Sequence, residues 1–297
     1  MAASNNNVND EHKDRVFKFL FGNPEKLEWT LSLYNAVNGS RYDNPDDIRL
    51  NTIDDVLYLG MKNDVSFIIM DDMHLWEHQS TYNPNMPMRF FIYAAKLYEK
   101  FIADPVNKYN PYSTTQQTAH CPKCICFYNG TGKQPERKLL RLSDAFKGKS
   151  DIEVTVTMLN VNYGQNAKLM RACKPIEEYA WLVNAIRRHE KKTHDLEAAV
   201  DAALAEMPDD FIIKKFLLLN KAEVKGMFLT EWDMEKVLAV DRLETEARTE
   251  ARVEARERKR TARAMLKKNL PLDLIQEVTQ LSAEAVIRLA KKLSVTV

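Results

Sequence analysis

The sequence predicts a mixed α/β fold, in which a sheet core flanked by helices precedes a helical C-terminal region with a long charged helix. Short runs rich in β-branched and aromatic residues lie between residues 48 and 161. Beyond Lys174 the apolar residues recur at helical spacing, and a charged four-residue repeat begins at Thr245. Strands followed by a run of helices are typical of an α/β core with a helical extension.

The first half of the chain is expected to alternate short strands with turns and two helices. Residues 14–38 have helical spacing, interrupted at Gly22-Asn23-Pro24, and the polar residues 1–13 are expected to be disordered. A second helix is predicted over 88–102 and a turn over 71–73. The strand-like runs are residues 48–53, 56–61, 65–70, 74–79, 125–128 and 152–161.

The second half is expected to be helical throughout. Helices are predicted over residues 176–191, 195–207 and 210–220, and from residue 235 onward. The predicted organisation is a core over 14–173, a helical extension over 174–240, a charged helix over 241–264 and a helix-turn-helix-like segment over 265–297.

The charged helix carries the repeat TEAR, TEAR, VEAR and ERKR. Helical residues two apart lie about 200° apart around the axis, so acidic and basic side chains form opposite stripes. This pattern favours an exposed, solvated spacer; a contact between two copies of the chain, or a surface that follows DNA, are the alternatives. The stripes are Glu246, Glu250 and Glu254, and Arg248, Arg252, Arg256 and Arg260.

Three short helices are expected at the C-terminus, over residues 261–268, 272–279 and 283–293. The tight connection at 280–282 resembles a helix-turn-helix, which would make Arg288, Lys291 and Lys292 candidate DNA contacts. A plain helical hairpin is the more ordinary interpretation.

Composition indicates a soluble, folded protein. The chain has 297 residues, 45% of them hydrophobic and 29% charged, with a formal net charge of +1. Attraction to phosphate must therefore come from local patches. The start of the chain, MAASNNNVNDEH, lacks an apolar stretch, and runs such as 65–70 are too short to cross a bilayer. A cytoplasmic location without membrane contact is expected.

The four cysteines raise a zinc hypothesis that the spacing does not favour. Cys121 and Cys124 have the separation of a metal knuckle, but no second matched pair follows. His120, Cys126 and Cys173 are the remaining candidate ligands. Ordinary buried or edge thiols are the favoured interpretation, so zinc is not expected.

The segment MKNDVSFIIMDDMHLWEHQS holds the candidate active site. Asp64 opens one apolar strand and Glu77 lies near the end of the next, so antiparallel pairing would bring them together. Glu77 and Gln79 share a face of their strand, and His78 points to the other face. Two carboxylates and an amide suit Mg²⁺, with Mn²⁺ as the alternative.

Several motifs, which follow one another in the family's order, resemble the recombination-promoting nuclease (Rpn) or transposase-like branch of the PD-(D/E)XK nucleases. The resemblance spans residues 14–164, and the charged tail is similar too, though less specifically. The motifs are DRVFKFLFG (14–22), KNDVSF (62–67), EHQST (77–81), NMPMR (85–89), FYNG (127–130) and VTMLNVNYG (156–164).

The resemblance implies a restriction-endonuclease-like fold with Asp64 and Glu77 as metal ligands and the His78 backbone carbonyl completing the site. Gln79 stands where most PD-(D/E)XK enzymes carry lysine, a substitution typical of this branch. An amide can orient water but supplies no positive charge. Metal ions, or a cation such as Lys18 or Arg89, would then stabilise the charge that develops on the phosphate.

The function expected from this resemblance is a metal-dependent DNA endonuclease linked to recombination, mobile elements or defence. A DNA-binding strand-transfer protein and a catalytically inactive interaction protein are the alternatives. Asp14 and Lys18 could instead form a helix-surface ion pair, and Arg89 could anchor structure rather than contact phosphate.

Overall fold

The computed structural model describes residues 16–51 and 64–293, apart from the side chains of residues 233–248, 251, 252 and 292. Its contacts divide the chain into two units, one ending at Glu235 and the other beginning at Lys236. The N-terminal residues 1–13, Asp14 and the strand predicted over 56–61 lie outside the described residues.

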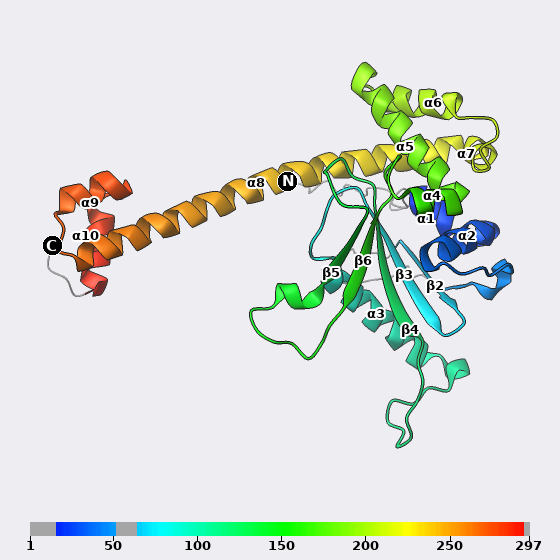
Figure 1. Cartoon of the computed structure of the whole chain (residues 1–297), viewed down its shortest axis with the longest axis horizontal. Coiled ribbons are helices and arrows are strands. Elements are labelled where there is room, and N and C mark those ends of the chain that lie inside the picture. The colour runs from blue at the N-terminus through cyan, green and yellow to red at the C-terminus, as the bar shows by residue number, and fades with distance from the viewer. Residues whose placement is uncertain (1–15, 52–63, 294–297) are drawn as a thin grey trace, which may run out of the picture. The chain divides into compact units, whose positions relative to one another are not determined.

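The first unit is built on a mixed six-stranded sheet in the order β1-β2-β3-β4-β6-β5 (Figure 1). The β1–β2, β2–β3 and β5–β6 pairs are antiparallel, whereas β3–β4 and β4–β6 are parallel. The predicted mixed sheet flanked by helices is therefore confirmed. The strands are β1 Arg49–Leu50, β2 Val65–Ile69, β3 Asp72–Gln79, β4 Cys121–Tyr128, β5 Arg137–Arg141 and β6 Thr155–Asn160.

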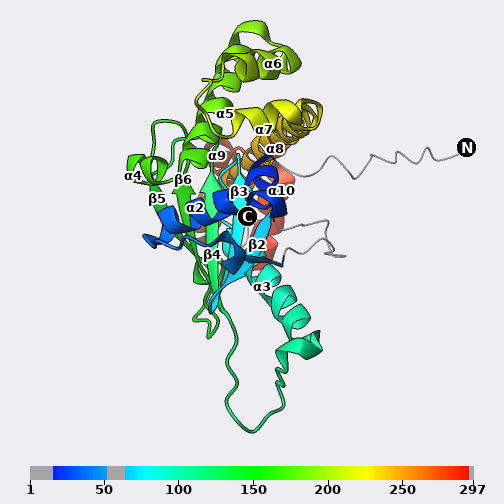
Figure 2. The same cartoon turned by 90° about the vertical axis from the view of Figure 1, so that its right-hand side faces the viewer.

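Alternation along the strands gives the sheet two apolar faces, each covered by helices. On one face Phe67, Trp76 and Phe127 belong to the core shared with helices α1, α2 and α5. On the other face Leu75 and Met158 pack with α3. Figures 1 and 2 show α2 and α3 beside the sheet and α5 beyond the end at which the strands converge. Their bounds are α1 Val16–Phe21, α2 Leu27–Asn38, α3 Met86–Ala103 and α5 Lys174–Thr193.

Most predicted strands and helices are present with shifted ends. The helix over 14–38 is interrupted as predicted, because α1 ends at Phe21 and Pro24–Lys26 forms a 3-10 turn before α2. The turn predicted over 71–73 lies instead at residues 70–71, since β2 ends at Ile69 and β3 begins at Asp72. Among the described strands and α-helices, two were not predicted: the edge strand β5 and the short helix α4, Ala167–Ala172.

The helical extension completes the core of the first unit. Leu182, Leu217 and Phe228, from α5, α7 and α8, are buried in the same core as the sheet residues. Lys225 of α8 lies 2.7 Å from both Glu197 and Asp201 of α6. The additional helices are α6 Leu196–Glu206, α7 Lys214–Leu219 and α8 Lys221–Lys267.

The second unit consists of the C-terminal part of α8 followed by α9, Leu272–Thr279, and α10, Ala283–Leu293. The separate helix predicted over 261–268 is instead the end of α8, because no helix-breaking residue precedes it. Leu266, Ile275 and Val286 form a small core of this unit. In the described part of the chain, no helix combines the length and apolar character needed to cross a membrane.

Candidate active site

Glu77 and Gln79 lie at the end of β3, on the face of the sheet that α3 covers. The residues that precede them on this face, Met73 and Leu75, are apolar and buried. Glu77 is 1% exposed and Gln79 is 8% exposed. A carboxylate at this depth requires a compensating partner, because burial removes its water.

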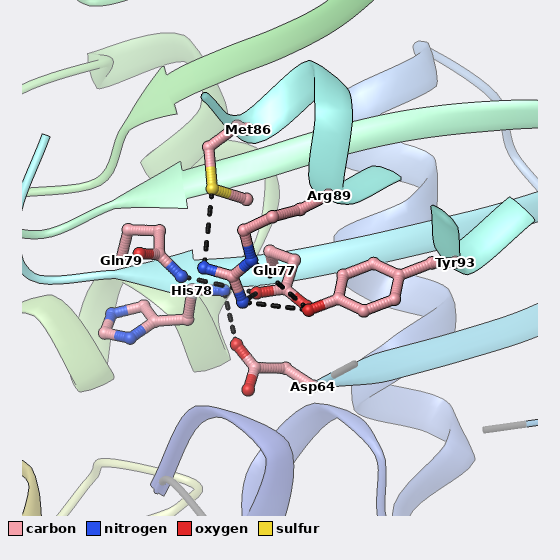
Figure 3. A network of polar contacts seen from close by, with 7 residues as sticks. All are labelled: Asp64, Glu77, His78, Gln79, Met86, Arg89 and Tyr93. Carbon is pink, nitrogen blue, oxygen red and sulfur yellow. Dashed lines mark hydrogen bonds and ion pairs between the residues drawn. The ribbon is translucent and has the colours of Figure 1, made fainter. Parts of the chain in front are cut away.

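Asp64 lies directly before β2, and strand pairing brings it to the same place. Val65 is paired with Trp76, so the next position outward sets Asp64 opposite Glu77. The backbone N–H of His78 donates to Asp64 Oδ2 over 2.6 Å. Figure 3 shows the Asp64 carboxylate turned toward β3 at this point. The structure thus brings Asp64, Glu77 and Gln79 together, and their chemical roles stay predictions.

Arg89 and Tyr93, one turn apart on α3, supply the compensating partner. Arg89 Nη2 lies 2.9 Å from Glu77 Oε2 and donates to Tyr93 Oη over 2.9 Å. Arg89 Nη1 is 3.7 Å from Met86 Sδ (Figure 3). The guanidinium therefore balances the charge of the buried Glu77 carboxylate.

The Tyr93 hydroxyl remains protonated in this environment. Burial, followed by the nearby Glu77 carboxylate, raises the pKa of Tyr93 to about 12. The Asp64 charge acts in the same direction. Tyr93 can thus orient Arg89 but cannot serve as a base near neutral pH. The four-residue spacing of Arg89 and Tyr93 places them on one helix face, which from the sequence leaves phosphate contact and structural anchoring open for the pair; the structure shows the two side chains in contact.

Gln79 contacts the same carboxylate oxygen as Arg89. Its Nε2 donates to Glu77 Oε2 over 3.3 Å. The amide group is thereby turned along the strand toward Glu77, with its oxygen oriented the opposite way (Figure 3). This geometry allows Gln79 to position Glu77 and, through its oxygen, a water molecule or substrate group.

His78 packs on the opposite face of the strand, as predicted. It is 2% exposed, and its ring stacks on Phe17 with centroids 5.2 Å apart. Nε2 is 3.2 Å from Tyr179 Oη, and Nδ1 is 3.4 Å from Glu231 Oε1. These contacts fix the strand at the residue whose backbone holds Asp64. Sequence reasoning missed Tyr179 and Glu231, because nothing local marks partners more than 100 residues away.

Lys18 lies close to the start of β2. Gly22 lies between the two: a methyl group added to Gly22 would be 3.3 Å from Lys18 Cγ and 3.2 Å from Val65 Cγ2. The side chains of Lys18 and Val65 are therefore close to each other. Val65 follows Asp64 directly. Lys18 is therefore in the neighbourhood of the site, whereas its predicted partner Asp14 is outside the described residues.

The donor chemistry of the site fits a hard divalent cation. Asp64 and Glu77 offer carboxylate oxygens and the His78 carbonyl adds a neutral oxygen, a donor set that Mg²⁺ prefers together with water. Among the described residues, no group of three or more His, Cys, Asp and Glu side chains is arranged to hold a metal. A cation here would thus depend on two carboxylates, with Arg89 adjacent to one of them.

The cysteines do not converge on one point. Cys121 and Cys124 are three positions apart on β4, so they belong to opposite faces of the strand. Cys173 is buried in the core on the side of α5. Burial raises the pKa of Cys124 to about 12 and that of Cys173 to about 11, which disfavours the thiolate forms.

The candidate DNA contacts at the C-terminus lie on α10. Arg288 and Lys291 are exposed, and Arg288 Nη2 is 4.0 Å from Glu284 Oε2. The side chain of Lys292 is outside the described side chains. Among the described side chains of this unit, exposure and the Arg288–Glu284 contact do not distinguish DNA from solvent for Arg288 and Lys291.

Comparisons of the chain with protein-family models, with curated proteins and with solved structures gave no match.

Proposed function

We propose that this chain is a divalent-metal-dependent DNA endonuclease of the PD-(D/E)XK type, which hydrolyses phosphodiester bonds. The observation that carries the proposal is the meeting of Asp64, Glu77 and Gln79 at the end of β3. A mixed sheet with helices on both faces is compatible with the restriction-endonuclease-like fold, which forms part of the proposal.

In this proposal Asp64 and Glu77 would hold the metal, and the His78 N–H keeps the Asp64 carboxylate in place. A bound Mg²⁺ would supply a Lewis acid for the phosphate and a more acidic water as the nucleophile. Gln79 orients the water or substrate through its amide oxygen.

Among the described residues, Arg89 is a cation well placed to meet the substrate. Its guanidinium lies against Glu77 and is anchored by Tyr93. Arginine forms paired hydrogen bonds to phosphate oxygens, so Arg89 can share or exchange its Glu77 contact for a DNA phosphate. This supplies the positive charge that Gln79 lacks.

The test is cleavage of supercoiled plasmid with and without Mg²⁺ or Mn²⁺. We expect Asp64→Asn and Glu77→Gln each to lower the cutting rate by about 100-fold or more, because each removes a charged ligand. Asp71→Asn is the matched control, since Asp71 is exposed at the other end of the same hairpin. Metal-dependent cutting by both site variants at the wild-type rate would overturn the proposal; joined DNA ends would instead indicate strand transfer.

The Arg89–Glu77 ion pair also favours a second candidate, a catalytically inactive interaction protein on the same fold. In that case the only role of the Arg89–Glu77 ion pair is to stabilise the fold. Metal binding separates the two, because a ligand of the folded state raises the melting temperature. The endonuclease proposal expects Mg²⁺ to raise the melting temperature of the wild type but not of Glu77→Gln. The second candidate expects no metal effect on either protein.

A further inference from the structure

A polar cleft of about 410 Å³ lies at the ends of β4 and β6, outside the candidate active site. The loop that follows β4 forms one wall, and α5 forms another. In Figure 1 the strands converge toward the end of the sheet at which α5 lies. The lining residues that matter here are Lys133, Asn160, Asn162, Tyr163, Arg187 and Lys191.

The cleft is positively charged. Lys133, Arg187 and Lys191 each contribute a cation, and no acidic side chain occurs among the described residues that line it. The chain has a net charge of only +1, so this concentration of cations is local. A concave surface of one charge sign attracts anions of the opposite sign.

Arg187 is held in position by Asn129 and Asn162. Its Nη1 donates to Asn129 Oδ1 over 3.0 Å and to Asn162 Oδ1 over 3.1 Å, and Nη2 donates to the Asn129 carbonyl. Asn129 is 2% exposed. These bonds use three of the five guanidinium N–H groups, which leaves Nε and one Nη2 hydrogen for a ligand. The guanidinium is therefore preorganised.

The cleft is aligned with the candidate active site. Gln79 is paired with Tyr128, and Tyr128 is paired with Asn160, so the three stand in one row across the ends of parallel strands. Neighbouring strands are about 4.8 Å apart, which sets Asn160 about 10 Å from Gln79. A DNA strand rises about 3.4 Å per nucleotide, so about three nucleotides cover this separation.

Tyr163 indicates a nucleic acid rather than an isolated phosphate. It lines the cleft, and 50% of its surface is exposed. An exposed aromatic ring beside cations offers a base a surface for stacking, which a small anion does not require.

We infer that this cleft binds the phosphodiester backbone of the DNA strand beside the bond that is cut. The inference rests on the proposed function for its substrate. Lys133 and Lys191 neutralise phosphates, and Arg187 forms paired hydrogen bonds to a phosphate group.

The test measures binding of a fluorescent 20-base-pair DNA duplex in EDTA, where metal-dependent cutting does not interfere. The double variant Lys133→Gln/Lys191→Gln is compared with Lys147→Gln/Lys149→Gln. The control lysines are exposed and precede β6, at the opposite end of that strand from the cleft. Both variants lose two positive charges. We expect the cleft variant to bind about tenfold more weakly, with a salt slope lower by about 1.8, and the control to match the wild type.

Plasmid cleavage with Mg²⁺ is measured on the same proteins, so the two proposals can fail separately. Equal affinity and salt slope in wild type and cleft variant would overturn the inference, even if the wild type cuts DNA. Equal weakening of both variants would also overturn it, since any loss of charge would then suffice. Weaker binding by the cleft variant alone, without cutting by any protein, would support the cleft and refute the nuclease.

Discussion

Two side chains at the site, Arg89 and Gln79, contact the same oxygen of Glu77. The Arg89 guanidinium contributes positive charge, whereas the Gln79 amide orients a water molecule or substrate group. Substitutions at the two positions should therefore have different effects on DNA cutting. Gln79 is the more informative, because the resemblance to PD-(D/E)XK nucleases makes lysine its natural replacement.

We expect Gln79→Ala to slow cutting by about 100-fold without abolishing metal binding, because it removes an orienting group but no charged ligand. Gln79→Lys should cut faster than Gln79→Ala, since an ammonium group can stabilise charge on the phosphate. Single-turnover cleavage and calorimetric Mg²⁺ binding check both. If the Gln79→Lys protein binds metal but cuts DNA as slowly as the Gln79→Ala protein, the role assigned to Gln79 is wrong.

His74, on β3 but on the other face, should make stability depend on pH. Burial, followed by the charge of Lys123, lowers the pKa of His74 to about 4. Its ring stacks on Phe67, and neither ring nitrogen has a hydrogen-bond partner among the described residues. Between about pH 6.5 and 4 the unfolded chain therefore binds more protons than the folded one, so the free energy of unfolding falls as the pH falls.

Over this pH window, protonation of His74 should lower the free energy of unfolding by about 3 kcal/mol. His74→Phe keeps the stacking and removes the titration, so its melting temperature should fall less between pH 7 and pH 4.5. His194→Asn is the control, because His194 is exposed and its positive φ suits asparagine. Identical pH profiles for His74→Phe and the wild type would contradict the assignment.

Among the elements, β2 and β3 were the most predictable from the sequence. The apolar run of β2 and the short turn after it indicated the pairing, and alternation along β3 indicated the shared face of Glu77 and Gln79 and the packing of His78 on the other face. The edge strand β5, with the sequence RKLLR, has neither alternation nor β-branched residues, and its pairing with β6 alone defines it. The start of β4 at Cys121 depends likewise on pairing with β3, which a propensity-based prediction does not include.

The junction after β4 depends on a glycine. A Cβ on Gly130 would overlap the Ser80 carbonyl oxygen and lie 2.6 Å from Tyr128 Oη. Ser80 follows Gln79, and the Asn129 N–H donates to the Gln79 carbonyl over 2.9 Å. A side chain at residue 130 would therefore displace the end of β3, where the candidate site lies.

We expect Gly130→Ala to lower stability by about 1–3 kcal/mol and to slow DNA cutting, because the backbone must move to accept the methyl group. Gly148→Ala is the matched control, since nothing lies within 4 Å of the point that its methyl group would occupy. Denaturant unfolding and plasmid cleavage check both variants. A Gly130→Ala protein as stable and active as Gly148→Ala would show that the junction tolerates the displacement.

At the scale of the whole molecule, the sheet and the helical extension share one core. The sequence predicts a boundary after residue 173, where strand signals stop. In the structure, buried residues on both sides of this position, such as Phe127 and Phe228, belong to a single core. Contacts divide the chain instead between Glu235 and Lys236, within α8. A boundary inside a continuous helix has no sequence signal such as a proline or glycine.

The first turns of α8 should therefore be essential for folding, and the remainder should not. Val224, Phe228 and Trp232 are buried in the core, and Glu231 contacts His78 behind the candidate site. Deleting one large core side chain costs about 2–5 kcal/mol, against a total stability of about 5–15 kcal/mol. A chain ending at Asn220 loses all of these residues, whereas a chain ending at Val240 keeps them.

We expect the chain ending at Val240 to melt cooperatively within a few degrees of the full-length protein and to cut DNA with Mg²⁺. The chain ending at Asn220 should show no cooperative transition by circular dichroism. A cooperative Asn220 chain with full stability would mean that α8 adds nothing to the core.

For the second unit, light scattering and DNA binding of the Val240 chain decide between a contact and a spacer. Fewer copies of the chain per particle than in the full-length protein indicate self-association through the charged helix, and a lower DNA affinity indicates a DNA surface. No change in either indicates a solvated spacer, as expected if the exposed ion pairs contribute only about 0–1 kcal/mol each.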